Sequence, residues 1–208
     1  MKIVVGPVTT GSNKLSYLLY ANELSKTSDI WVPKDLSAKR FKSFSDSSEQ
    51  HILHSYQTNL LPTIPENAEI FFCIKENYLE YISDLWLHDN ANNLPKHPVQ
   101  LEKAYAMYAM LKLKNHLQYY IEFLKSNVLN CKTHVMCYED WNDDFSKIPI
   151  TDFGIPNHFQ QHIPNEIEYN KEDYIDMDHL ESFVRKWNWG TNGSLIFNYK
   201  RYLLNSST

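Results

Sequence analysis

The sequence predicts a three-layer α/β domain with a mainly parallel central sheet. Two observations lead to this fold class. Strand and helix patterns alternate along the chain, and the strands are apolar on both faces, as in sheets that helices cover on both sides. The chain has 208 residues, 43% of them hydrophobic and 22% charged, which is enough to build a core. Because we find neither an internal repeat nor a linker, we expect a single domain over residues 1–208.

The first strand and helix have the clearest patterns. Ile3-Val4-Val5 is a β-branched run closed by Gly6-Pro7, which predicts a short buried strand. Helical periodicity begins after Gly11, and Ser12 and Asn13 suit the turn that opens such a helix. Its apolar face is formed by leucines at helical spacing, namely Leu15, Leu18, Leu19 and Leu24.

The rest of the chain continues the alternation. The strongest strand pattern is Glu69–Ile74, which is apolar on both faces and should therefore be central. Shorter strands are predicted at residues 29–33, 51–55 and 133–138, the last ended by Glu139-Asp140. Helices are predicted at residues 76–87, 99–126 and 178–187, loops at 89–98 and 146–170, and either a surface loop or an irregular helix at 34–49.

Charge and composition exclude several classes of protein. The formal net charge of −5 argues against a broad basic face for nucleic acid. Apolar runs such as Ile70–Ile74 are too short to span a membrane, and Met1–Gly6 is too brief for a signal peptide. The cysteines have no pairing or zinc-site spacing, so we expect a cytoplasmic protein without a metal. They are Cys73, Cys131 and Cys137.

The turn after the first strand is the first chemical signal. A strand, a loop with Gly6 and Gly11, and a helix form the layout that binds phosphate, because N–H groups and the helix dipole favour an anion there. Thr10 and Ser12 can add hydroxyl hydrogen bonds. An ordinary strand-to-helix turn accounts for the same residues. The Walker form of the loop needs a lysine at position 12, and here the lysine is Lys14.

The end of the strongest strand is the second signal. Lys75 follows this strand directly, and Ser83 comes eight positions later on the next predicted helix. Here the chain resembles the sulfotransferase family, whose donor is 3′-phosphoadenosine 5′-phosphosulfate (PAPS). In that family a basic residue, usually the arginine of Arg-x-Pro, and a serine at this offset hold the 3′-phosphate. Lys75-Glu76-Asn77 keeps the charge but lacks the arginine fork and the proline.

Other segments fall in the family's order. Gly6–Asn13 resembles the loop that holds the 5′-phosphosulfate, with Thr9 where the family has a basic residue and Lys14 as a substitute cation. His54, shortly before Leu60-Leu61-Pro62, is similar to the family's general base. Tyr138–Trp141 resembles a Tyr-Glu-Asp-Leu segment that ends a later strand, and we interpret it as structural.

The resemblance implies transfer of a sulfuryl group from PAPS to a hydroxyl or amine of a small molecule or glycan. It assigns catalysis to His54 and Lys14, and the 3′-phosphate to Lys75 and Ser83. The 5′-phosphosulfate would be held by the loop residues Thr9, Thr10, Gly11, Ser12, Asn13 and Lys14.

Plainer interpretations stay open for these residues. His54 is also consistent with a core histidine, Lys75 with a solvated lysine, and Ser83 with an ordinary helix serine. Two other functions also stay open. One is a P-loop kinase or other nucleotide phosphotransferase that uses ATP and magnesium. The other is a non-catalytic binding protein of the sulfotransferase fold, which Thr9 in place of the basic residue favours.

Overall fold

The computed structural model describes residues 1–24, 52–56, 67–125, 131–150, 152–155, 157 and 169–186. It divides into two compact units. Unit 1 comprises residues 1–74 and 122–166, and unit 2 comprises residues 75–121 and 167–208. The expectation of one domain stays a prediction. The strand expected at 29–33 lies outside the described residues, as do most of 146–170 and the tail after 186.

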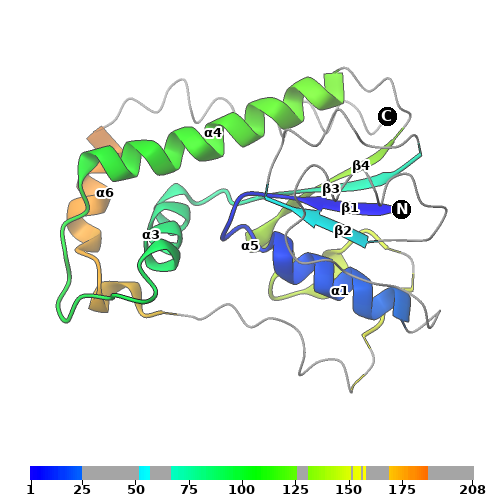
Figure 1. Cartoon of the computed structure of the whole chain (residues 1–208), viewed down its shortest axis with the longest axis horizontal. Helices are drawn as coiled ribbons and strands as arrows, with labels where there is room; N and C mark the ends of the chain where they lie inside the picture. Colours follow the sequence, from blue (N-terminus) through cyan, green and yellow to red (C-terminus); the bar gives the residue numbers. More distant parts are fainter. Residues whose placement is uncertain are drawn as a thin grey trace. The chain divides into compact units, whose positions relative to one another are not determined.

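The described residues of unit 1 form a four-stranded sheet (Figure 1) whose strands all run parallel. Its order is β2-β1-β3-β4, so β3 lies between two neighbours, and its predicted central position is confirmed. The mixed α/β class with a parallel sheet is therefore confirmed. The strands are β1 (Lys2–Val5), β2 (Ile52–Ser55), β3 (Glu69–Ile74) and β4 (Lys132–Cys137).

The strand order creates a switch point between β1 and β3. The chain leaves β1 for β2 on one side, and it leaves β3 for β4 on the other side. Connections that depart in opposite directions from adjacent parallel strands open a crevice at the carboxyl ends of those strands. In open α/β sheets this crevice is the usual place for a ligand. The loop that follows β1, residues 6–11, lies at this point.

Helix α1 (Ser12–Leu24) covers one face of the sheet, as its leucine periodicity predicts. Val4 and Phe71 are register partners, so they lie on the same face. On the opposite face Phe72 contacts Phe123 near the end of helix α4, with ring centroids 5.7 Å apart. The core against α1 contains Val4, Leu15, Leu18, Leu19, Ile52, Phe71, Cys73, Met136, Trp141 and Ile148.

A short helix follows β4 and completes this core. The predicted strand over 133–138 ends one residue earlier, at Cys137, and Tyr138–Trp141 forms the helical turn α5. Trp141 is buried within the α1 core, and Tyr138 packs against it edge-on. A 3-10 turn, η2 (Phe145–Lys147), follows α5.

The described part of unit 2 consists mainly of helices. It contains α3 (Tyr78–Asp89), most of α4 (Lys103–Lys125), the 3-10 turn η4 (Lys171–Asp173) and α6 (Met177–Lys186). These confirm the helices predicted at 76–87, 99–126 and 178–187, with shifted ends. Helix α4 begins four residues late because Val99 pairs with Ile175 in an isolated parallel bridge. Among the described residues, no helix is long and apolar enough to cross a bilayer.

Candidate functional site

The loop between β1 and α1 has an unusual backbone. Thr9 (φ 69°) and Gly11 (φ 71°) are both left-handed, on either side of Thr10. A left-handed threonine costs on the order of 1–2 kcal/mol, so the surrounding structure must impose it. Thr10 fixes the turn, because its Oγ1 donates to the Pro7 carbonyl at 2.7 Å. Alternation of this kind turns successive N–H groups toward one side and forms an anion-binding concavity.

The first turn of α1 adds further N–H groups. The first helical bond runs from Leu15 N to Gly11 O at 2.8 Å, so the N–H groups of residues 11–14 precede it. Within the described part of the chain, no residue accepts a hydrogen bond from these groups. The helix dipole places partial positive charge at the same position. The loop is therefore suited to a phosphate or sulfate oxygen.

Close packing holds the two loop glycines in place. A Cβ on Gly11 would lie 2.4 Å from Tyr138 Cδ2 and 2.7 Å from Trp141 Cζ2. A Cβ on Gly6 would lie 2.7 Å from Cys73 Cβ on β3. Neither glycine has room for a side chain, so α5 and β3 fix the path of the loop.

His54 and Ser12 form a buried pair beside the loop. Nε2 of His54 lies 3.0 Å from Oγ of Ser12. The pair forms because His54 is the register partner of Val4 and so lies on the sheet face that α1 covers. The side chains are 1% and 2% exposed. Burial lowers the pKa of His54 to about 4, so the imidazole is neutral at pH 7.

The other predicted loop residues have distinct surroundings. Thr9 Oγ1 is buried and has no hydrogen-bond partner among the residues that the structure describes. Asn13 lies in the first turn of α1, where its carbonyl accepts from Ser16 Oγ at 2.7 Å. Lys14 donates to Asn142 Oδ1 at 2.6 Å, and its ammonium lies 5.7 Å from the centre of the Phe145 ring. The cation expected to replace Thr9 is thus held by the segment after α5.

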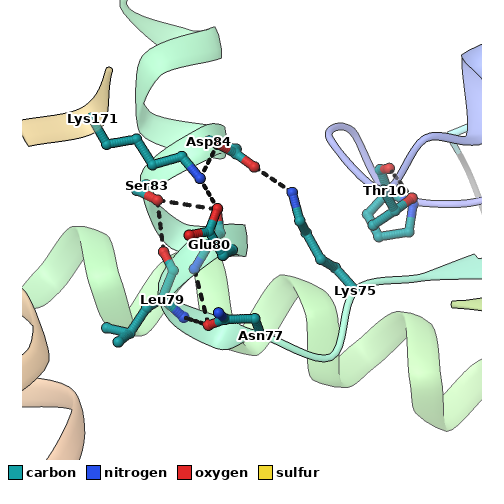
Figure 2. Close-up of polar contacts among 9 residues, drawn as sticks. Thr10, Lys75, Asn77, Leu79, Glu80, Ser83, Asp84 and Lys171 are labelled. Carbon is teal, nitrogen blue, oxygen red and sulfur yellow. Dashed lines mark hydrogen bonds and ion pairs between the residues drawn. The ribbon is translucent and has the colours of Figure 1, made fainter. Parts of the chain in front are cut away.

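Lys75 lies in a separate ionic cluster within unit 2 (Figure 2). Its ammonium is ion-paired with Asp84 Oδ2, and Lys171 pairs with Asp84 Oδ1 at 2.9 Å and also with Glu80. Lys75 is 4% exposed, so it is a buried charge rather than a solvated lysine. Burial, with the nearby charge of Lys75, lowers the pKa of Lys171 to about 8.

Ser83 lies on α3 in the same unit, one residue before Asp84. Its Oγ donates to the carbonyls of Leu79 at 2.8 Å and Glu80 at 3.1 Å. Figure 2 shows both contacts beside the lysine cluster. Ser83 is fully buried, and bonds to carbonyls three and four residues earlier are those of an ordinary helix serine, so that interpretation stays open. A hydroxyl can accept as well as donate, so these contacts leave its lone pairs.

The structure brings together Thr9–Lys14 with His54 in unit 1, and Lys75 with Ser83 in unit 2. The expected separation of about one nucleotide between the two groups stays a prediction. Sequence reasoning missed Asp84 and Lys171, which no motif marks. It also took Trp141 as purely structural, although its indole N–H is buried without a partner among the described residues.

Within the described residues, no group of three histidine, cysteine, aspartate or glutamate side chains could hold a metal ion. A scan against protein-family models finds no match. A search of curated proteins likewise finds no match.

Proposed function

We propose that this protein binds PAPS and transfers its sulfuryl group to a hydroxyl or amine of a small molecule or glycan. The observation that carries the proposal is the loop after β1. Its left-handed residues Thr9 and Gly11, and the N–H groups of residues 11–14, form an anion site at the switch point of a parallel sheet.

The loop is the part proposed to hold the 5′-phosphosulfate. Two buried polar atoms there, Thr9 Oγ1 and Trp141 Nε1, have no hydrogen-bond partner among the described residues. Buried polar atoms are normally paired, and an unpaired one costs about 1–3 kcal/mol. An anionic ligand at the loop would supply acceptors for such donors.

Lys75 and Ser83 are proposed to hold the 3′-phosphate. Lys75 directly follows β3, the strand beside β1 across the switch point. In the structure its charge is neutralised by Asp84. Binding therefore requires the phosphate to replace Asp84 as the counter-ion of Lys75. Asp84 would keep Lys171 as its own partner, so this partly buried carboxylate is not left without a cation.

The reaction requires the protein mainly to position the donor and acceptor and to stabilise the charge that develops on the leaving group. The acceptor oxygen or nitrogen attacks sulfur and loses its proton to a base. The bond from sulfur to the bridging phosphate oxygen breaks, and adenosine 3′,5′-bisphosphate leaves. The resemblance assigns the base to His54, which burial keeps neutral at pH 7 and whose Nε2 already contacts Ser12. Lys14, held near the loop by Asn142, is the cation proposed to steady the leaving oxygen.

Calorimetric titration tests the binding step. Adenosine 3′,5′-bisphosphate should bind in the absence of metal and more tightly than adenosine 5′-phosphate, because only the bisphosphate reaches Lys75. Substitution of Lys75 by methionine should remove this difference and leave the affinity for adenosine 5′-phosphate unchanged. No binding of the bisphosphate would overturn the proposal. Preferential binding of ATP with magnesium would favour a nucleotide phosphotransferase instead.

Sulfur-labelled PAPS tests the transfer step. Incubation with a panel of phenols, amines, alcohols and glycans should give a labelled product together with adenosine 3′,5′-bisphosphate. The non-catalytic alternative has one specific observation in its favour, namely that Thr9 supplies a hydroxyl where the family has a basic residue. Binding of the bisphosphate without transfer to any acceptor class would support that alternative.

A further inference from the structure

We infer that His54 is a positioning residue: its Nε2–H donates to Ser12 Oγ and so directs the only proton of Ser12 toward an anion at the start of α1. The inference rests on the proposed function, because this anion is the 5′-phosphosulfate end of the donor. It gives His54 a role in binding that is separate from the general-base role implied by the family resemblance.

The hydrogen-bond inventory of Ser12 leads to this role. A serine hydroxyl has one proton and two lone pairs. Among the described residues its hydrogen-bond partners are His54 Nε2 at 3.0 Å and the Gly6 carbonyl, to which Ser12 Oγ donates across a long 3.4 Å contact. If Ser12 donated to His54, it would present only lone pairs to an anion. If His54 donates to Ser12, the described residues hold the hydroxyl proton only through the long contact to the Gly6 carbonyl, and a ligand oxygen at normal hydrogen-bond distance can replace that contact.

A second buried donor without an acceptor in the described part of the chain, the indole N–H of Trp141 in α5, lies beside the same loop. Trp141 is 1% exposed, and its Nε1–H has no partner among the described residues. Its Cζ2, two bonds from Nε1, lies 2.7 Å from the position of a Cβ on Gly11. Leaving a buried donor unpaired is costly. The indole of Trp141 is thus a buried donor beside Gly11 that has no acceptor among the described residues.

The burial of His54 also favours the positioning role. A general base must come within hydrogen-bond reach of the acceptor's proton. His54 is 1% exposed, and its Nε2 is engaged by Ser12. The two roles differ in a measurable way. A positioning residue changes the affinity for the nucleotide even when no acceptor is present. A general base acts only on the acceptor's proton, so its loss leaves that affinity unchanged.

A double-mutant cycle on ligand affinity tests the inference. The variants are Ser12→Ala, His54→Leu, the two combined, and His54→Gln, whose amide keeps a donor. The probe is adenosine 3′,5′-bisphosphate, titrated by calorimetry without any acceptor. Ser12→Ala and His54→Leu should each weaken binding of the bisphosphate about tenfold, the typical effect of one hydrogen bond to a charged group. The double variant should lose no more than either single variant, and His54→Gln should retain most of the affinity.

The outcomes separate this inference from the proposed function. If the wild type binds the bisphosphate and His54→Leu binds it equally well, the inference is overturned and the proposed function stands. If losses in the two single variants simply add, the residues act independently and the inference fails. If the wild type does not bind the bisphosphate, both fail together. Urea unfolding of every variant confirms that affinity is compared between folded proteins.

A measurement on the unaltered protein avoids any concern about folding. Nitrogen-15 NMR of labelled histidine distinguishes the two neutral tautomers. The His54 ring should be protonated at Nε2 and not at Nδ1 at pH 7, with and without bisphosphate. A proton on Nδ1 in the bound state would mean that Ser12 donates to His54, and it would overturn the inference.

Discussion

Gly11 is the residue of the loop with the strictest requirement. It is left-handed at φ 71°, and a Cβ would lie 2.4–2.8 Å from Tyr138 and Trp141. Gly11→Ala should therefore destabilise the protein by about 3 kcal/mol, from backbone strain together with overpacking. Urea unfolding measures this loss. Gly154→Ala is the matched control, because nothing lies within 4 Å of its Cβ position, and it should change stability little.

Asp84 is the residue that tests how Lys75 is used. If a 3′-phosphate must replace Asp84 on Lys75, removal of that carboxylate charge should favour the phosphate. Asp84→Asn should therefore bind adenosine 3′,5′-bisphosphate several-fold more tightly than the wild type, as measured by calorimetry. Lys171 would keep Glu80 as its partner in this variant. Unchanged or weaker affinity would show that the Lys75–Asp84 pair is structural and does not bind the ligand.

At the scale of elements, Asn77 determines where helix α3 begins. It stands where the sulfotransferase pattern has proline, and it caps α3, accepting from Leu79 N at 3.1 Å and Glu80 N at 3.3 Å. Asn77→Ala should cost about 1 kcal/mol of unfolding free energy in urea, the usual value of an N-cap. Asn77→Asp should retain the cap. An equal loss in both variants would indicate that the cap does not carry the effect.

Single elements were predictable where their own residues determine them. Ile3–Val5 and Glu69–Ile74 are compact apolar runs, so they form strands whatever their neighbours are. The start of α4 was not predictable, because Val99 is withdrawn from the helix by a bridge to Ile175, far along the chain. The single turn at Tyr138–Trp141 is likewise stabilised by packing against Gly11 and the α1 core.

The candidate site was predictable only as separate pieces. The loop of residues 6–11 and the start of α1 could be identified as a candidate anion site from their local sequence. The contact between His54 and Ser12 spans 42 positions and depends on the β1–β2 register, which no local pattern reports. Lys171 joins Asp84 from an even more distant segment. The first pair depends on the order of the strands and the second on the packing of η4 against α3, and neither can be predicted from local sequence.

At the scale of the whole molecule, the buried histidine makes stability depend on pH. The pKa of His54 is about 4 in the folded protein, against 6.5 for an ordinary histidine. As the pH falls from 6.5 to 4, the unfolded chain takes up a proton at this position and the folded protein does not. The folded state should lose about 3 kcal/mol over that range from this group alone.

Urea unfolding at several pH values between 4 and 8 measures this loss. The pKa values of Glu69 and His134 are also lowered, so their contributions to stability also diminish in acid. His54→Gln should remove the contribution of His54 to the pH dependence of the unfolding free energy. His97→Gln is the control, because His97 is exposed. Equal slopes in the wild type and His54→Gln would contradict the assignment.

The pairing of β3 with β4 has a consequence for synthesis. These neighbours align Glu69 with Lys132, and residues 75–131 separate them along the chain. During translation β1, β2 and β3 emerge well before β4, so the nascent sheet has an open edge of apolar residues until late. Closing so long a connection also slows folding. Recombinant production should therefore benefit from low temperature and added chaperones, which protect that edge until β4 arrives.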